Sequence, residues 1–398
     1  MEKFKEKIQK RVSEIFEELV EIRRHIHQHP ELAMEEFNTA AYIAAKLDEY
    51  GIKYKSGIAV TGILGIIEGE KKSLSKRVVA LRADMDALPI KETNELPYKS
   101  INEGVMHACG HDMHIACLLG AAKILNEFKK DFSGTVKLIF QPSEEKFPGG
   151  ALQMIKEGVL ENPKPDIVIG QHCLPELECG YVGFRAGKFM ASTDEVYITV
   201  TGRGGHAATP HLNIDPVLIA AQIIVALQQI VSRAAPPSIP TVLSFGSFIA
   251  DGKTNIIPDE VNLQGTLRSF CEEWRVKAHI KIQEMVTGIA ESMGAKAKVR
   301  IDKGYPYLVN NLELTDKCIN YSVDYLGEAK VKELDMRMTA EDFAYYSQLI
   351  PSCFYRIGVG NTEKGITANL HTSNFNIDEN SLNYGAGLLA FITFRELI

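Results

Sequence analysis

The sequence lacks an excess of positive charge, a regular cysteine framework and an apolar leader. Its 44 basic and 51 acidic residues give a net charge of −7, so charge gives no reason to expect binding to nucleic acid or to an anionic membrane surface. The seven cysteines are odd in number and lack disulfide-framework spacing, which indicates a reducing compartment. Residues 1–25 are densely charged, and no apolar run approaches bilayer-spanning length. We therefore expect a cytoplasmic protein with no nucleic-acid partner and no membrane association.

Apolar spacing predicts an α/β domain at both ends of the 398-residue chain, which is comfortably long for two domains. One amphipathic helix is predicted over residues 3–28 and a second at about 36–50. Short apolar runs then alternate with helices, a pattern typical of a mainly parallel sheet. The predicted strands are 60–68, 77–82, 136–140 and 166–170. We expect this domain to comprise residues 1–186 and 302–398.

The middle of the chain, residues 187–301, has a different order of elements. The predicted order is strand, helix, two strands, helix and strand, which is the split βαββαβ unit of a ferredoxin-like α+β domain. These elements are residues 194–202, 214–233, 241–249, 260–269, 272–293 and 296–301. We therefore predict an inserted domain.

A short stretch, residues 106–114, gathers four potential metal ligands and a carboxylate. A helix could not turn Cys109 and His111 the same way, so joint ligation requires a loop, with Gly110 supplying the tight backbone. Asp112 is then predicted to cap a helix from Met113 to about residue 129. A Cys-x-His pair suits borderline-soft divalent ions. A buried free cysteine with capping histidines fits the same residues, so both interpretations stay open.

Other polar residues fall just past the carboxyl ends of the apolar runs, where open α/β sheets bind ligands. They are Asp84, Asp86, Glu144, Glu145 and His172. Three strands thus deliver carboxylates and a histidine to one edge, which favours a metal site. Adjacent glutamates beside a metal can divide the work, one as ligand and the other as general base.

Further candidates come from later in the chain. His206, in a glycine-rich turn, could donate to a developing oxyanion. Asn255 and Arg268, assigned to the two central strands of the inserted domain, could hold a substrate carboxylate. His371 becomes of interest because a two-metal site needs another ligand. By contrast, His25, His27 and His29 have no interleaved acidic or cysteine partner, which favours a structural or capping role.

The chain resembles the metal-dependent aminoacylase, hippurate hydrolase and carboxypeptidase family, in the branch with the plant auxin-conjugate amidohydrolases. Eight short motifs in order carry the resemblance, which covers nearly the whole chain. They are Arg24-x-x-His27-x-x-Pro30-Glu31, residues 82–89, residues 107–112, residues 141–145, Gly202-x-Gly204-Gly205-His206-Ala207, Thr254-Asn255-x-x-Pro258, Glu341-Asp342-Phe343 and Leu370-His371.

The resemblance implies a dinuclear site for two divalent ions, with zinc, manganese, cobalt and nickel as candidates. Its ligands would be Cys109, His111, Glu145, His172 and His371. Glu144 would be the general base, and Asp86 would orient a ligand. His206 would reach the active site of a partner subunit, with the inserted domain forming the interface of a homodimer or a higher homo-oligomer.

The expected activity is metal-dependent hydrolysis of the amide bond of N-acyl-L-amino acids, with N-acetyl or N-benzoyl groups as examples. A dipeptidase or carboxypeptidase differs only in the acyl group, and a cysteine-nucleophile hydrolase using Cys109 is a further alternative. A catalytically silent binding protein is a third, against which Glu144 counts. Two features depart from the family pattern: the loop 145–150 is one residue longer, and Cys173 follows the ligand His172.

Overall fold

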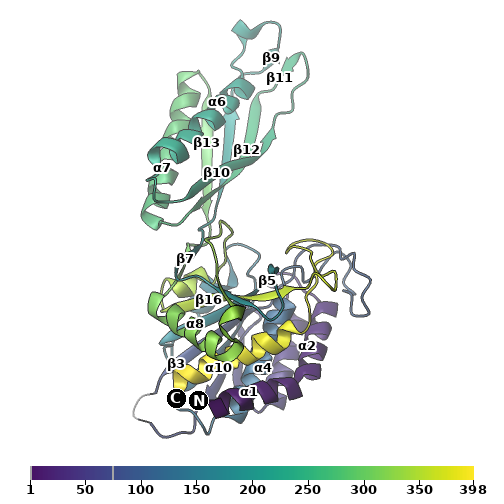
Figure 1. Ribbon diagram of the computed structural model, residues 1–398. Coiled ribbons are helices and arrows are strands. Elements are labelled where there is room, and N and C mark those ends of the chain that lie inside the picture. The colour runs from purple at the N-terminus through teal and green to yellow at the C-terminus, as the bar shows by residue number, and fades with distance from the viewer. Residues whose placement is uncertain (1, 74–75) are drawn as a thin grey trace. The chain divides into compact units, whose positions relative to one another are not determined.

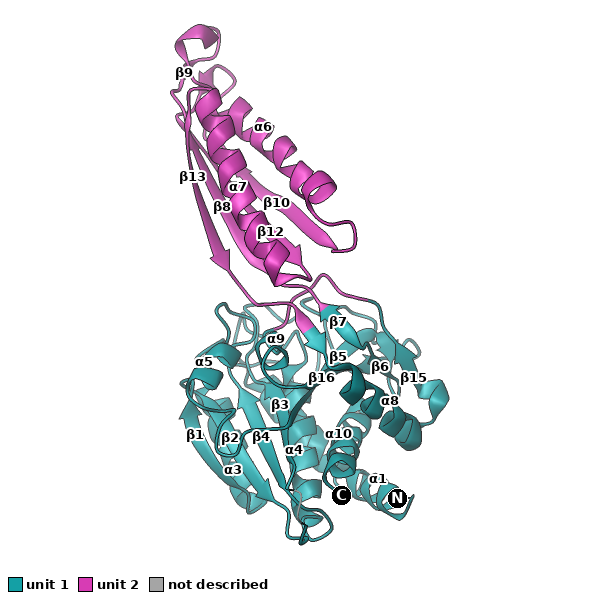
Figure 2. Ribbon diagram, turned by 90° about the vertical axis from the view of Figure 1, so that its left-hand side faces the viewer, with its two compact units in different colours: residues 1–189, 309–335, 342–398 teal, residues 190–308, 336–341 magenta. Residues whose placement is uncertain are grey.

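The computed structural model describes residues 2–73 and 76–398. The chain divides into two compact units, which Figure 2 distinguishes by colour. Unit 1 comprises residues 1–189, 309–335 and 342–398, and unit 2 comprises residues 190–308 and 336–341. The short excursion 336–341 into unit 2 has no counterpart in the predicted domain boundaries.

Unit 1 contains a mixed sheet of eight described strands in the order β1-β2-β4-β3-β5-β16-β6-β15 (Figure 1). The four central strands, β4, β3, β5 and β16, are parallel to one another, which confirms the predicted mainly parallel sheet. The strand bounds are β1 Lys53–Ile58, β2 Gly62–Glu68, β3 Val78–Asp84, β4 Thr135–Gln141, β5 Ile167–Glu178, β6 Val182–Phe184, β15 Val331–Glu333 and β16 Ser352–Gly360. The parallel centre matters for function because it brings carboxyl ends of strands to one edge.

The helices of unit 1 surround this sheet, and α4 packs on β3 and β5 and against α2 and α10. Their bounds are α1 Glu2–Glu14, α2 Phe16–Gln28, α3 Phe37–Glu49, α4 His111–Glu127, α5 Gly150–Lys156, α8 Leu312–Leu326, the 3₁₀ turn η3 Glu328–Lys330, α9 Ala344–Ser347 and α10 Ser381–Leu397. The prediction of a single helix over 3–28 is wrong, because Ile15 leaves the helical region with φ −97° and ψ 8°. The buried apolar stripe continues across this break, which is why spacing alone suggested one helix.

Unit 2 has a four-stranded antiparallel sheet in the order β10-β12-β8-β13, with two long helices. This order confirms the ferredoxin-like prediction. The bounds are β8 Asp194–Thr201, α6 Pro216–Gln229, the π-helical turn η2 Ile230–Ala234, β10 Thr241–Ile249, β12 Glu260–Ser269, α7 Glu272–Ser292 and β13 Lys296–Lys303. A small two-stranded antiparallel sheet, β9 Gly205–His206 with β11 Ile256–Ile257, and the 3₁₀ turn η1 Pro210–Leu212 complete the unit. Strands β7 Gly187–Met190 and β14 Leu308–Asn310 lie where the chain passes between units.

Helix α6 and η2 together correct one expectation from the sequence. Residues 216–234 form a helix long and apolar enough to cross a membrane by length and composition, so the expectation that no stretch approaches this length is wrong. One face of α6 is buried in the core of unit 2 through Ile219, Ala220, Ile223 and Leu227. Core packing therefore accounts for that face, whereas Leu218 and Val225 on the other face are exposed.

Candidate metal centre

Cys109, in the loop before α4, and His111, the first residue of α4, lie side by side, as expected if both are ligands. Gly110 is the N-cap of α4 and has φ 81°, a left-handed conformation that favours glycine. A Cβ atom there would lie 2.4 Å from Cys173 Sγ, so the close approach of Cys173 also requires glycine. Cys173 itself is a buried small residue, and its Sγ lies 3.1 Å from the carbonyl oxygen of Cys109.

Asp112 is not the N-cap of this helix, contrary to the prediction, because α4 already begins at His111. The Asp112 carboxylate instead lies 2.7 Å from Arg23 Nε and 2.8 Å from His27 Nδ1, and all three side chains are fully buried. His27 Nε2 is 3.1 Å from Glu92 Oε1. This network ties α2 to the first turn of α4, in agreement with a structural role for His27.

Three strands bring the remaining candidates to the same edge. Asp84 ends β3, and Glu144 and Glu145 follow β4, as the alternating runs predicted. His172 differs, since it lies inside β5, which continues to Glu178. The strand continues because β16 pairs with it beyond this point.

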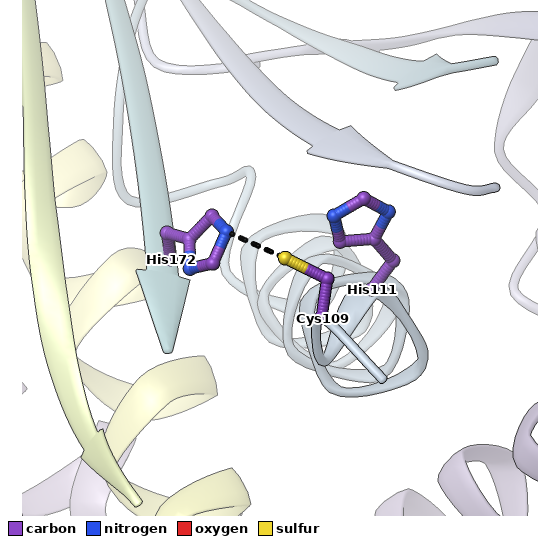
Figure 3. A group of neighbouring side chains, drawn as sticks. All are labelled: Cys109, His111 and His172. Carbon is purple, nitrogen blue, oxygen red and sulfur yellow. Dashed lines mark hydrogen bonds between the residues drawn. The ribbon is translucent and has the colours of Figure 1, made fainter. Parts of the chain in front are cut away.

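Cys109 is the centre of the cluster. Its Sγ lies 3.4 Å from His172 Nε2 and 3.3 Å from His371 Nε2. Figure 3 shows the sulfur facing the His172 ring with His111 beside it. Two groups of possible ligand atoms, each within 4.8 Å of one another, share this sulfur: Cys109, His111 and His172 in one, and Cys109, Glu145 and His371 in the other. A ligand atom shared by two groups of donors is an arrangement that suits a dinuclear site.

The donor atoms fit a divalent ion. Tetrahedral zinc with Zn–S of about 2.3 Å and Zn–N of about 2.0–2.1 Å separates sulfur and nitrogen ligands by about 3.5 Å, close to the observed spacings. His111 Nδ1 lies 2.8 Å from the Asp86 carbonyl oxygen, to which it donates, so in the neutral form that binds a metal the ring would carry its lone pair on Nε2. That Nε2 is buried and has no hydrogen-bond partner among residues 2–73 and 76–398.

The electrostatics of the metal-free site also favour a cation. Burial, and then the charge of Glu145, raise the pKa of the Cys109 thiol well above its usual value. Burial lowers the pKa of His111, but Asp84 and Asp86 outweigh it and raise the pKa to about 10. Burial, and then Arg356, lower the pKa of His172 well below its usual value. The protons on Cys109 and His111 compensate the negative charge of Asp84, Asp86 and Glu145, and a divalent ion would take their place.

Asp86 fixes the main chain of the two glutamates. Its Oδ1 accepts the N–H of Glu144 and its Oδ2 accepts the N–H of Glu145, both at 2.9 Å. Its own carbonyl oxygen accepts from His111, as described above. Asp86 therefore orients the predicted general base and two predicted ligands at once.

Sequence reasoning missed two features of the site, the hydrogen bonds of His114 and the strained backbone at Ser143 and His371. His114 donates from Nδ1 to Asp84 Oδ1 at 2.6 Å and accepts the Cys173 N–H at Nε2 at 2.9 Å, so both ring nitrogens are engaged. His114 thereby fixes the main chain of β5 at Cys173, the residue after His172. Backbone strain is the second feature, because Ser143 has φ 53° and His371 has φ 61°. A histidine three residues after His111 was a visible signal for the first, whereas left-handed backbone at Ser143 and His371 has none in the sequence.

The candidates of unit 2 fall into two groups. His206 is exposed in β9, and its Nδ1 accepts the Ala208 N–H at 3.0 Å, which leaves the proton on Nε2. The Asn255 carbonyl accepts the Ala207 N–H at 3.0 Å, so Asn255 lies beside His206. Asn255 precedes β11 and is not on a central strand, contrary to the prediction. The segment between β10 and β12 carries Asn255 to the separate two-stranded sheet of β9 and β11.

Arg268 lies at the other end of this unit. Along β12, Glu260 pairs with Thr201 and Leu267 pairs with Asp194, while His206 follows Thr201 in the chain. From Glu260 to Arg268 is 268 − 260 = 8 residues, or about 26 Å of extended strand. The structure therefore does not bring Arg268 together with Asn255 and His206 within one chain.

Comparison with known proteins agrees with this geometry. Residues 80–394 match the model of peptidase family M20/M25/M40. The chain is 42% identical to an N-acyl-L-amino acid amidohydrolase of Geobacillus stearothermophilus, over 77% of this chain and 81% of that one. It is 40% identical to thermostable carboxypeptidase 2 of Saccharolobus solfataricus, over 98% of both. Among solved structures, a dinuclear metal-binding M20 peptidase of Bacillus subtilis has a TM-score of 0.81 and 31% identity, covering 97% of this chain and 99% of that one.

Proposed function

The chain belongs to peptidase family M20/M25/M40 and is a metal-dependent amidohydrolase, and we propose that it hydrolyses the amide bond of N-acyl-L-amino acids. The observation that carries the proposal is the Cys109 sulfur, shared by two groups of ligand atoms beside a glutamate pair that Asp86 holds in place. The name of the Geobacillus relative supports this substrate class.

We propose that Cys109, His111, Glu145, His172 and His371 hold two divalent ions, which could be zinc, manganese, cobalt or nickel. When bound, such ions supply Lewis acidity toward the acyl carbonyl and lower the pKa of a bound water to about 7. Glu144, buried and oriented by Asp86, takes the proton of the attacking water and returns it to the departing amine.

Unit 2 would complete the site from a second copy of the chain. In this proposal Arg268 binds the substrate carboxylate through its guanidinium fork, and His206 contacts the developing oxyanion. Asn255, predicted to share the carboxylate with Arg268, lies beside His206 of the same chain instead. Because Arg268 and His206 lie at opposite ends of the sheet, one active site would take them from two chains. The exposed face of α6 supports a homodimer, since residues 216–232 carry no charge and Val225 is 72% exposed. The edge strand β10 adds exposed Phe248 and Ile249.

A dipeptidase or carboxypeptidase is the second candidate, favoured by the name of the Saccharolobus relative. The two activities share the metal centre and differ in the acyl group. A cysteine-nucleophile mechanism fits the site poorly, because the Cys109 thiol is buried and its pKa is raised, whereas a nucleophilic cysteine needs a lowered pKa. A silent binding protein would have no use for an oriented Glu144.

The decisive experiment is turnover of N-acetyl-, N-benzoyl- and N-indoleacetyl-amino acids beside simple dipeptides. Chelated protein would be assayed with Zn²⁺, Mn²⁺, Co²⁺ or Ni²⁺ added back. We expect metal-restored release of free amino acid from the acylated substrates in preference to the dipeptides. Faster dipeptide cleavage would instead establish the peptidase, and stoichiometric metal without turnover would refute the proposal.

A further inference from the structure

Asp342 lies in the Glu341-Asp342-Phe343 motif, to which the proposed mechanism assigns no role. Its side chain is fully buried. It is also the first residue of unit 1 after the excursion 336–341 into unit 2. The peptide bond between Glu341 and Asp342 is therefore a boundary between the two units.

The carboxylate of Asp342 is fixed within unit 1 by four hydrogen bonds. Oδ1 accepts from Arg82 Nη2 at 2.6 Å and from Gln141 Nε2 at 2.8 Å. Oδ2 accepts from Gln141 Nε2 at 2.8 Å and from the Ala151 N–H at 3.0 Å. Arg82 and Gln141 are buried on neighbouring parallel strands, and charge-assisted bonds of this kind hold their groups firmly.

The main chain of Asp342 contacts the predicted general base. Its N–H donates to Glu144 Oε1 at 3.3 Å. Asp86 fixes the Glu144 main chain, as described above, whereas the Asp342 N–H contacts the Glu144 side chain itself. Asp342 thus acts on the carboxylate group that must face the water.

The residues just before Asp342 are held by unit 2. The carbonyl oxygens of Arg337 and Thr339 accept the Ala191 N–H at 3.0 and 3.1 Å, and Met190 forms a β-bridge with Arg337. Residues 337–339 are thus attached to unit 2, while the Asp342 carboxylate is attached to unit 1. Only a few residues of chain separate the two attachments.

We propose that Asp342 is a positioning residue that orients Glu144, and that the segment 336–341 makes this orientation depend on unit 2. The inference rests on the proposed role of Glu144 as general base. The physical reason is that a shift of about 1 Å in a catalytic group can cost about 100-fold in rate. A pull on residues 337–339 would be transmitted through the chain to the N–H that contacts Glu144.

The first test is Asp342→Asn, which keeps the shape and weakens the pairing with Arg82. On metal-loaded protein we expect kcat to fall by about 10- to 100-fold, with KM within about twofold and metal content unchanged. The matched control is Asp194→Asn, which breaks an equally buried pair with Arg275 in unit 2. It should lower the melting temperature similarly while kcat stays within about twofold. Equal losses of kcat in both variants would overturn the inference.

A second test shows whether the effect passes through Glu144. In a Glu144→Gln background, Asp342→Asn should change the residual turnover by less than about twofold, because residues that act as one unit are non-additive. A full further loss would overturn the positioning role. If Glu144→Gln alone kept wild-type turnover, the proposed function would fail; an inactive Glu144→Gln with a wild-type Asp342→Asn would remove this inference alone.

The dependence on unit 2 has its own test. Two glycines inserted between Thr339 and Ala340 lengthen the link without touching either attachment. We expect kcat to fall by about 3- to 10-fold with unchanged KM and metal content. Two glycines inserted between Met293 and Gly294, in the exposed turn between α7 and β13 of unit 2, are the control and should leave kcat unchanged. Unchanged kcat in the Thr339 insertion would overturn the coupling.

Discussion

The candidate residues of unit 1 and of unit 2 are organised in opposite ways. In unit 1 the side chains of Cys109, His111 and His172 are buried, fixed by hydrogen bonds and within ligand distance of one another. In unit 2 His206 and Asn255 are exposed, and Arg268 lies at the far end of β12. Burial and preorganisation suit a metal centre that one chain builds alone. Exposure and separation suit residues that act on a substrate held together with a second chain.

The largest expected effect tests the metal centre of unit 1, which is proposed to be built by one chain. Glu144→Ala should lower kcat by about 10²- to 10⁴-fold, because it removes general acid–base catalysis while leaving the ligands in place. Initial rates and metal content of the purified variant would be measured together. Glu95→Ala, an exposed glutamate of unit 1, is the control. Turnover near the wild-type level in Glu144→Ala would contradict the mechanism.

The next effect tests whether unit 2 acts across two chains. His206→Ala should lower kcat by about 10²- to 10³-fold through loss of an oxyanion donor. Co-expression with Glu144→Ala should restore about a quarter of wild-type activity, because half of the dimers are mixed and each holds one complete site. His211→Ala, an exposed neighbour, should stay active. A co-expressed mixture that remains inactive would place His206 in its own chain's site.

A smaller effect tests the surface that would join the chains. Val225→Asp puts a charge into the uncharged exposed face of α6 and should shift the protein to monomers, with activity reduced about tenfold at assay concentration. Light scattering and metal content would be measured on the same sample. Val276→Asp, on the exposed side of α7, is the matched control and should stay dimeric. Dimers in both variants would exclude α6 as the interface.

The smallest effect concerns a buried lysine of unit 1 and the dependence of stability on alkaline pH. Burial lowers the pKa of Lys137 in unit 1 to about 8. The unfolded chain then binds more protons at Lys137 than the folded chain between pH 8 and about 10.4, so the contribution of Lys137 to stability rises with pH. Buried cysteines such as Cys109, whose pKa is raised, act in the opposite direction. The free energy of unfolding of metal-free Lys137→Met, minus that of the wild type, should therefore fall as pH rises through this window. A constant difference would contradict a lowered pKa of Lys137.

Sequence reasoning predicted those parts of the fold and site that depend on local order. Apolar spacing indicated the parallel sheet and the ferredoxin-like insertion, because strand and helix periodicities are local properties. Gly110 indicated a loop at Cys109 and His111; the left-handed Gly110 bears this out for Cys109, whereas His111 is already the first residue of α4. Local rules failed where tertiary partners competed, as at Asp112, which pairs with Arg23 instead of capping α4.

The sequence by itself determined which chemical groups are available, and their order in eight motifs was enough to indicate the family. Only the tertiary structure decided which of these groups meet. Cys109 lies 63 residues from His172 and 262 from His371, and the packing of two loops beside β5 brings them within 3.4 Å. The same holds for Arg268, which β12 carries away from His206, and for Asp342, whose N–H reaches Glu144 across 198 residues. Such distances depend on how strands pair and helices pack, and no local pattern encodes them.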